Sequence, residues 1–355
     1  MKLPTLVDVY TWVKETEKLG YVPMEGIYRH ALSLSKTYTP AIIDTYNEDS
    51  IPYREALKDV EKFIGKPIVY MRAISPSYEE GFVWVSIAVD SFCPHILNFP
   101  NAIKVTVLHD TMATKGVFGE SNKNQFLLGA RHNDYFAYVS EYAKKCFIEY
   151  YTSTISTSID DSVFGKYGNY HRWSELPSRS LLSLHYYSSS VGSVYERKNL
   201  RLVLEHAKKS RLTHFHVGSF KGECEEDIVS YSLLQSFHYL GALSDTMTEE
   251  VVSKCGVFYC LSKDEGFSMT PLEAIVLGVE KIILSDIPAH REVYDEREVN
   301  FVDIESEIPK AEDLSVTVSE DYRKYMFDEY NRTNVENRFE NFLKHATRNH
   351  SRNSQ

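Results

Sequence analysis

The sequence has little cysteine, no long apolar run and no excess of basic residues over its 355 positions. Its five cysteines are odd in number and form no Cys-x-x-Cys pair, which argues against a disulfide framework or structural zinc and favours a reducing compartment. No apolar run approaches the about 18 residues that a membrane span needs. Pro4 and Asp8 interrupt the N-terminal segment, so it lacks the apolar core of a signal peptide. These absences predict a cytoplasmic location.

The charge balance is acidic, with 39 Lys+Arg against 50 Asp+Glu and a formal net charge of −11. A chain of this charge is not suited to coating phosphate backbones, so we predict no nucleic-acid partner. Neither Gly-x-Gly-x-x-Gly nor a P-loop occurs, which removes the fingerprints of nicotinamide enzymes and ATPases. His214 and His216 alternate like metal ligands, but no further ligand has suitable spacing, so no metal site is predicted.

Strand and helix patterns alternate along the chain, which predicts an α/β fold. The expected strands are residues 6–13, 68–71, 82–89, 103–109, 135–140, 180–187, 213–218, 236–241, 256–262 and 281–285. The expected helices are 26–36, one that Ser140 caps with Glu141 in its first turn, 199–209, 248–254 and 271–277. In helix 199–209, Leu200, Val203, Leu204 and Ala207 form the inward face. Two consecutive Rossmann-like units follow from this order, with ligands beyond the carboxyl ends of their strands.

The segment 153–180 is rich in serine, glycine and aromatic residues and has no clear periodicity, so we place the linker between the units inside it. The predicted domains are residues 1–175 and residues 176–321. Residues 322–355 form a last helix that packs on another part of the chain and ends in a frayed tail. That helix carries an apolar stripe of Val335, Phe339 and Phe342.

Residues 260–293 carry the most informative pattern of the chain. A strand is followed by a loop with Gly266, and Thr270 precedes Pro271. The spacing Thr270-x-x-Glu273 predicts a capping box with proline at the first helical position. The loop would then bring the N-terminus of a helix to the carboxyl edge of a sheet, which favours binding of an anion. Glu265 in the loop suits hydrogen bonds from sugar hydroxyls.

Glu265 and Glu273, separated by seven residues, lie in S-x-D-E-G-F-S-M-T-P-L-E-A, which S-D-I-P-A-H-R-E-V follows. This pattern resembles the signature of family 4 retaining glycosyltransferases with the GT-B fold. Shorter stretches at 26–32, 105–110, 132–147 and 196–199 are similar to that family's first glycine loop, active-site histidine strand, serine-capped helix and diphosphate-binding lysine segment. The resemblance implies two Rossmann-like domains that face each other across a central cleft. Residues 1–175 would then bind the acceptor and residues 176–321 the donor, and the last helix, within residues 322–355, would cross back to the first domain.

The resemblance also implies roles for individual residues. His109, Glu265 and Lys198 would be catalytic: Glu265 holds hydroxyls of the donor sugar, Lys198 neutralises the diphosphate, and His109 reaches the sugar from the other domain. Gly26 would let its loop approach the phosphate and the acceptor. The implied donor-binding residues, among which Glu273 holds the ribose, are Arg197, Lys198, Gly266, Phe267, Ser268, Met269, Thr270 and Glu273.

The implied activity is transfer of a sugar, with retention of configuration, from a nucleotide-diphosphate donor to a glycan, lipid-linked or small-molecule acceptor. No metal or other cofactor is expected, and UDP- or GDP-sugars are the expected donors. Residues 185–196 contain no arginine, whereas the family places a glycine and then an arginine shortly before the lysine. A protein that binds nucleotide sugar or glycan with weak or no catalysis is therefore an alternative, and a phosphorylase or nucleotide-sugar epimerase is another. Lys144 and Lys145 beside Phe147 suit a solvated helix face better than a weak peripheral membrane contact.

Overall fold

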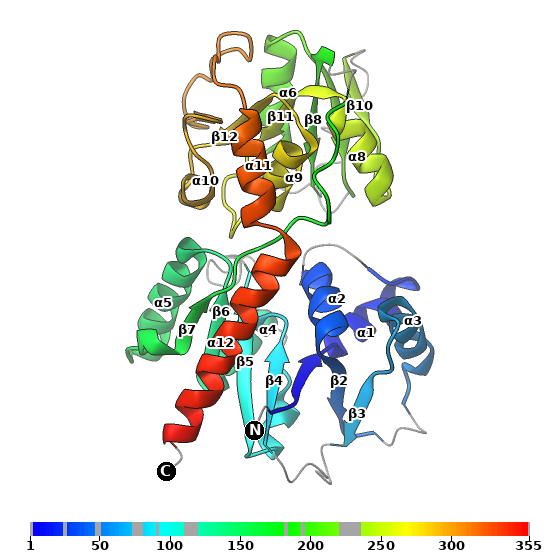
Figure 1. Ribbon diagram of the computed structural model, residues 1–355, viewed down its shortest axis with the longest axis vertical. Coiled ribbons are helices and arrows are strands. Elements are labelled where there is room, and N and C mark those ends of the chain that lie inside the picture. Colours follow the sequence, from blue (N-terminus) through cyan, green and yellow to red (C-terminus); the bar gives the residue numbers. More distant parts are fainter. Residues whose placement is uncertain are drawn as a thin grey trace. The chain divides into compact units, whose positions relative to one another are not determined.

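The computed structural model describes residues 3–23, 27–46, 51–72, 81–89, 92–109, 120–180, 184–192, 196–219 and 236–353 (Figure 1). The chain divides into two compact units. The first unit consists of Met1–Tyr167 with Arg338–Gln355, and the second unit is Gly168–Asn337. Each unit is built around one parallel sheet. The predicted α/β class with two Rossmann-like units is confirmed.

The first unit contains a seven-stranded sheet in the order β3-β2-β1-β4-β5-β6-β7, in which every described pair is parallel. Its strands are β1 (Thr5–Asp8), β2 (Thr39–Asp44), β3 (Val69–Arg72), β4 (Phe82–Ser86), β5 (Ala102–Leu108), β6 (Tyr135–Tyr138) and β7 (Phe164–Lys166). Its helices are α1 (Tyr10–Leu19), α2 (Ile27–Thr37), α3 (Arg54–Ile64), α4 (Glu120–His132) and α5 (Glu141–Ile155). The strand order reverses between β1 and β4.

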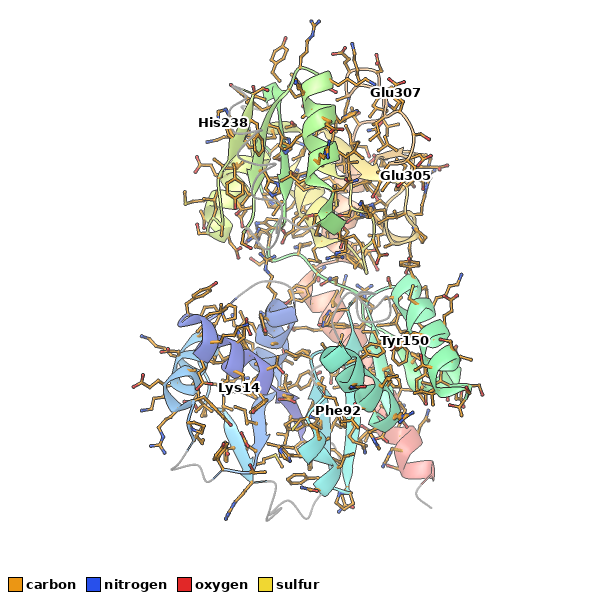
Figure 2. The ribbon with its side chains drawn as sticks, turned by 180° about the vertical axis from the view of Figure 1, so that it is seen from behind. Lys14, Phe92, Tyr150, His238, Glu305 and Glu307 are labelled. Carbon is orange, nitrogen blue, oxygen red and sulfur yellow. The ribbon has the colours of Figure 1, made fainter. Side chains whose placement is uncertain are left out.

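Apolar side chains cover the sheet of the first unit. One cluster gathers Trp84 and Phe92 with residues from the neighbouring strands, and a second includes Phe136 and Phe147 and has Tyr150 packed against it. Phe92 and Tyr150 are labelled in Figure 2. Such burial is expected for a parallel sheet whose crossover helices shield it from water.

The second unit contains a six-stranded parallel sheet in the order β10-β9-β8-β11-β12-β13. Its strands are β8 (Leu184–Val191), β9 (Thr213–Val217), β10 (Phe237–Tyr239), β11 (Cys255–Cys260), β12 (Lys281–Ser285) and β13 (Asn300–Val302). Its helices are α6 (Leu200–Lys209), α8 (Asp245–Ser253), α9 (Met269–Leu277), α10 (Pro288–Val293) and α11 (Glu320–Glu329). The predicted inward face of α6 is confirmed, because its four apolar residues are all buried.

Of two local predictions one is confirmed and one is wrong, and one helix was not predicted. The serine cap of α5 is confirmed, since Ser140 Oγ accepts a hydrogen bond of 3.0 Å from the N–H of Ala143. The strand predicted at 6–13 is too long, because β1 ends at Asp8 and α1 begins at Tyr10. Asp8 Oδ1 accepts the N–H of Tyr10 at 2.9 Å, which satisfies a free N–H at the helix start. The sequence analysis missed α3, whose buried residues Ala56, Val60 and Ile64 recur every four positions.

The last helix, α12 (Arg332–Asn353), contains the border between the two units, which falls between Asn337 and Arg338. Within the first unit, the Phe339 ring is fully buried and lies 4.9 Å from the Tyr167 ring. The Phe342 ring fits over Gly165, where a Cβ atom would come within 2.2 Å of it. The borders predicted at 175 and 321 thus differ from the ends of the compact units. No described helix has the length and apolar character to span a membrane.

Candidate active site

The candidate site of the second unit lies where its strand order reverses, between β8 and β11. The loops that leave the carboxyl ends of two such strands diverge, and open α/β sheets bind ligands at this point. The loop after β8 ends in a short 3₁₀ turn (Glu196–Lys198), and the loop after β11 spans residues 261–268. A backbone hydrogen bond of 2.8 Å from the N–H of Lys263 to the carbonyl of Arg197 joins the two loops.

Glu265 is the centre of the site. Its side chain is only 7% exposed, and its Oε1 accepts a hydrogen bond from Lys198 Nζ at 2.5 Å. Its Oε2 accepts from Arg197 Nη1 at 3.2 Å, and the same nitrogen donates to the carbonyl of Asp264 at 3.0 Å. Burial alone would raise the pKa of Glu265, but the charges of Lys198 and Arg197 outweigh it and lower the pKa to about 2. The structure therefore brings together three of the predicted site residues.

The turn that presents the two cations ends in an unusual backbone conformation. Asn199 has φ +52° and ψ +39°, in the left-handed region, and α6 begins at the next residue. Asparagine enters this region more readily than other residues with a side chain. The 3₁₀ turn therefore ends at Lys198, whose ammonium donates a hydrogen bond to Glu265. The sequence analysis did not single out Asn199, although an asparagine after the lysine is a signal for such a turn.

The predicted capping box at Thr270 is wrong. Helix α9 begins at Met269, Ser268 is its N-cap, and no side chain caps it through a hydrogen bond. Thr270 and Pro271 therefore lie inside the first turn, where proline is tolerated because its missing N–H would have no helical partner. The N-terminus of α9 still follows directly on the Glu265 loop, as predicted.

Buried hydrogen bonds hold both ends of the Glu265 loop. Ser285 Oγ donates to the carbonyl of Ser262 at 2.5 Å, and Tyr294 Oη donates to the carbonyl of Ser268 at 2.6 Å. Ser268 has a positive φ of +67°, and its Oγ lies 3.4 Å from the sulfur of Cys260. These contacts fix a backbone conformation that would be unfavourable for a free serine. The loop is preorganised, with Glu265 at its middle.

A buried thiol and imidazole lie next to the two ends of the loop. Cys260 Sγ is 3.8 Å from His290 Nε2, while His290 Nδ1 is 2.9 Å from the carbonyl of Ser285. Burial raises the pKa of Cys260, but the contact with His290 outweighs it and brings the pKa to about 7. Burial alone would lower the pKa of His290, but the interaction with Cys260 contributes to a net rise. The sequence analysis did not identify this pair.

Glu273 is buried in the second turn of α9. Its Oε2 lies 3.6 Å from Arg172 Nη2, and the same guanidinium forms ion pairs of 2.6 Å with Asp245 and 3.1 Å with Glu249. Arg172 is thus the shared cation of three carboxylates. The sequence analysis placed Arg172 in the linker segment and gave it no role, because no periodic pattern surrounds it. Contact of Glu273 with a ribose stays a prediction.

The other predicted residues of the second unit belong to the loop or to the first turn of α9. Phe267 is buried, and its ring meets that of Tyr330 edge-on at 5.3 Å. This ring contact joins the loop to the residue that follows α11. Gly266, Met269 and Thr270 contribute backbone to the loop and to the first turn of α9. Gly26 lies outside the described residues.

His109 belongs to the first unit and follows β5 at the carboxyl edge of that sheet. Burial lowers its pKa to about 4, although a hydrogen bond with the backbone of Ile87 opposes the effect. The imidazole is therefore neutral at physiological pH. The predicted approach of His109 to Glu265 across a donor sugar stays a prediction.

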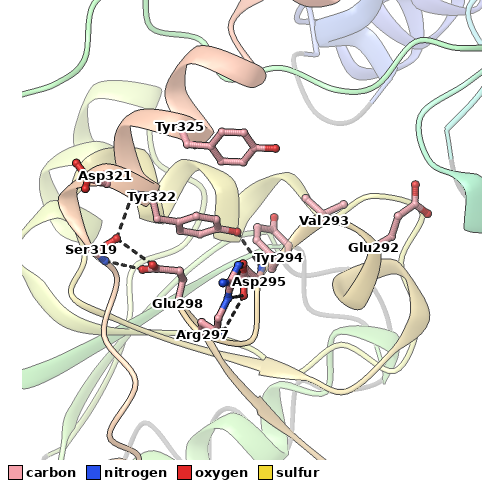
Figure 3. Close-up of a pocket in the computed structure, with 10 residues that line it drawn as sticks. All are labelled: Glu292, Val293, Tyr294, Asp295, Arg297, Glu298, Ser319, Asp321, Tyr322 and Tyr325. Carbon is pink, nitrogen blue, oxygen red and sulfur yellow. Dashed lines mark hydrogen bonds and ion pairs between the residues drawn. The ribbon is translucent and has the colours of Figure 1, made fainter.

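A separate pocket of about 650 Å³ opens on the second unit (Figure 3). Its lining includes Tyr294, Asp295, Arg297, Glu298, Tyr322 and Tyr325. The carboxylate of Glu298 accepts hydrogen bonds from the N–H and the hydroxyl of Ser319, at 2.8 and 3.0 Å. None of the predicted site residues lines this pocket. No group of three or more His, Cys, Asp or Glu side chains suited to a metal ion occurs among the described residues.

Comparison with known proteins gives a family match within the second unit. Residues 185–307, which lie within the second unit and include Lys198, Glu265 and Glu273, match the family described as Glycosyl transferases group 1. The O-antigen biosynthesis glycosyltransferase WclY of Escherichia coli is 26% identical over 151 residues. The alignment spans 41% of this chain and 41% of WclY, so the chain matches about two fifths of that relative's length.

Solved structures share the fold over nearly the whole chain. Anabaena HepE in complex with UDP and glucose has a TM-score of 0.70 at 11% identity and covers 97% of this chain and 100% of its own. The N-terminal domain of Candida albicans trehalose-6-phosphate phosphatase has a TM-score of 0.64 at 11% identity, with 97% of both chains covered. At such identities the likeness shows the fold alone. The predicted GT-B fold is confirmed, and residues 185–307 carry the glycosyl transferase match.

Proposed function

We propose that the protein is a metal-independent, retaining glycosyltransferase that transfers a sugar from a nucleotide-diphosphate donor to a carbohydrate acceptor. The observation that carries the proposal is the buried Glu265 between Lys198 and Arg197, at the reversal point of the second sheet. A carboxylate at this position suits donor hydroxyls, and two adjacent cations suit a diphosphate. Because HepE was solved with UDP-glucose, UDP-glucose is the first donor to test.

The chemistry requires opposite charges at two points. When the bond between sugar and diphosphate breaks, negative charge grows on the leaving group and positive charge grows at the anomeric carbon. Lys198, Arg197 and the N-terminus of α9 would stabilise the leaving group without a metal ion. Arg197 would then supply the positive charge that the family takes from an arginine earlier in the loop. When the diphosphate binds Lys198 and Arg197 in place of Glu265, the carboxylate of Glu265 is free to accept hydrogen bonds from the sugar hydroxyls.

The test compares Lys198→Ala with Lys208→Ala, an exposed lysine of the same unit. Calorimetric titration of the full chain with UDP should show at least a tenfold loss of affinity in Lys198→Ala and none in Lys208→Ala. His109→Ala should lower turnover of UDP-glucose and leave the affinity for UDP unchanged. Equal affinity of Lys198→Ala and the wild-type protein for UDP would contradict the proposed diphosphate site.

A binding protein without catalysis is the second candidate, because the carboxylate of Glu265 already pairs with both cations and offsets part of their charge. UDP release from UDP-glucose distinguishes the two. Tight binding of UDP-glucose without UDP release, in the presence or absence of sugar acceptors, would favour the binding protein. For an active enzyme, the coupling constant of the product's anomeric proton reports retention or inversion.

A further inference from the structure

Ser268 begins α9 with a backbone conformation that a serine rarely adopts. Three other helices, α5, α8 and α11, also have a serine at the N-cap, namely Ser140, Ser244 and Ser319. Each of those serines has an extended backbone, and its hydroxyl accepts a hydrogen bond from the N–H three residues further on, as is usual for an N-cap. Ser268 instead has φ +67° and ψ +85°, and its side chain makes no capping hydrogen bond. A residue with a side chain is disfavoured in this region, so other groups must hold Ser268 there.

The sequence explains why Ser268 does not cap its helix in the usual way. The residue three positions further on is Pro271, which has no N–H to donate. The hydroxyl of Ser268 lies instead 3.4 Å from the buried sulfur of Cys260. The hydrogen bond that favours an extended backbone at the other three serines is therefore missing at the start of α9.

Tyr294, the residue that follows α10, stabilises the conformation of Ser268. Its Oη donates a hydrogen bond of 2.6 Å to the carbonyl of Ser268, and its side chain is buried. Burial raises the pKa of the Tyr294 phenol, and a hydrogen bond with the backbone of Leu272 opposes this rise. A hydrogen bond with that effect comes from a donor, so the phenol oxygen also accepts the N–H of Leu272. This N–H and the carbonyl of Ser268, four positions apart, are the two groups that close the first turn of a helix.

The conformation of Ser268 bears directly on Glu265, three residues earlier in the chain. Of residues 261–268, all of which the structure describes, Ser268 is the one with a positive φ. A rotation from positive to negative φ at Ser268 would turn the preceding residues relative to α9 and move the carboxylate of Glu265 away from Lys198. The position of Glu265 therefore depends on the hydrogen bond from Tyr294.

We propose that Tyr294 is a positioning residue for sugar transfer, because its hydroxyl holds Ser268 in the conformation that places Glu265 at the donor sugar. The inference rests on the proposed glycosyltransferase function. Tyr294 acts through the backbone of Ser268 and not by contact with the substrate. Lys198 belongs to the other loop, which Lys263 joins to the first half of the Glu265 loop. Loss of the Tyr294 hydroxyl should therefore affect transfer of the sugar much more than binding of the diphosphate.

The test is a double-mutant cycle of Tyr294→Phe and Ser268→Gly in the full chain. Tyr294→Phe keeps the buried ring and removes only the hydroxyl. With serine at position 268, it should lower the kcat of UDP release from UDP-glucose at least tenfold and leave the affinity for UDP within threefold. Glycine adopts positive φ about as readily as negative φ, so with glycine at position 268 the same change should lower kcat less than threefold. A hydroxyl with a merely structural role would cause the same loss in both backgrounds.

Tyr259→Phe is the matched control in the same unit. It also removes a buried hydroxyl, which lies 2.9 Å from Nδ1 of His206. The variant should have a lower Tm, because the imidazole loses its partner, but its kcat should stay within threefold of the wild-type value. A tenfold loss of kcat in this control as well would assign the effect of Tyr294→Phe to general destabilisation and overturn the positioning role.

Hydrogen exchange of residues 266–272, measured by mass spectrometry without ligand, tests the same cycle independently of activity. Tyr294→Phe should accelerate exchange at least tenfold with serine at position 268 and less than threefold with glycine. Unchanged exchange, unchanged kcat, or equal losses in both backgrounds would each overturn the positioning role. If the wild-type protein releases no UDP from UDP-glucose, the proposed function fails instead, and the exchange cycle still shows whether Tyr294 holds the loop.

Discussion

Replacing Glu265 by glutamine should change how the stability of the second unit depends on pH. The pKa of Glu265 is lowered from 4.5 to about 2, so its ionised form stabilises the fold. A difference of this size corresponds to about 3 kcal/mol at neutral pH. Because the folded-state pKa lies below the unfolded one, this contribution is complete above pH 4.5 and is lost as the pH falls toward 2. By pH 3, about 2 kcal/mol of it should be gone.

The uncharged amide of Glu265→Gln cannot make this contribution, and it leaves Lys198 and Arg197 without their counter-charge. We therefore expect the variant to be less stable than the wild-type protein by about 3 kcal/mol at pH 7 and by about 1 kcal/mol at pH 3. Urea unfolding of 5-fluorotryptophan-labelled protein measures this, because Trp173 reports on the second unit. Glu305→Gln, at an exposed acid of the same unit, is the control. A stability difference that stays constant from pH 7 to pH 3 would refute the charge pairing.

Two further predictions concern the supporting structure, and a third concerns the proposed diphosphate site. Arg172→Met should destabilise the second unit by about 3–5 kcal/mol, because Glu273, Asp245 and Glu249 lose their shared cation, and an unchanged Tm would contradict this. Gly165→Ala should destabilise the first unit by about 1–3 kcal/mol through overlap with Phe342. In the Gly165→Ala background, Phe342→Leu should recover part of that loss in urea unfolding, and a further drop would contradict the overlap. UDP release from UDP-glucose should be the same with EDTA or with Mg²⁺, and dependence on Mg²⁺ would argue against Lys198 and Arg197 as the groups that neutralise the diphosphate.

Local periodicity was enough to predict much of the fold. The inward face of α6 and the cap at Ser140 depend on residues three or four positions apart, so the sequence displays them directly. The start of α1 was missed because Val9 to Val13 are as typical of a strand as of a buried helix. The cap at Thr270 failed because the backbone of Ser268, fixed by Tyr294 from another element, decides where α9 begins.

The site was predicted in part, and the missing part has a physical reason. The Lys198 segment and the Glu265 loop were singled out by their sequence pattern, and the side chains of Lys198 and Glu265 do meet, whereas a role for Glu273 at a ribose stays a prediction. Arg172 and His290 act through contacts with residues far along the chain, and no local pattern marks such partners.

The course of α12 means that the first unit is not one continuous stretch of sequence. Residues 338–355 belong to it, and Phe339 and Phe342 pack beside Tyr167 and Gly165. A fragment that stops at Tyr167 would expose this apolar surface to water and lose the burial of two aromatic rings. Chimaeras that exchange the first unit between relatives must therefore transplant two segments together. Ribosomal synthesis delivers the second segment last, so the first unit completes its core only after the second unit has been made.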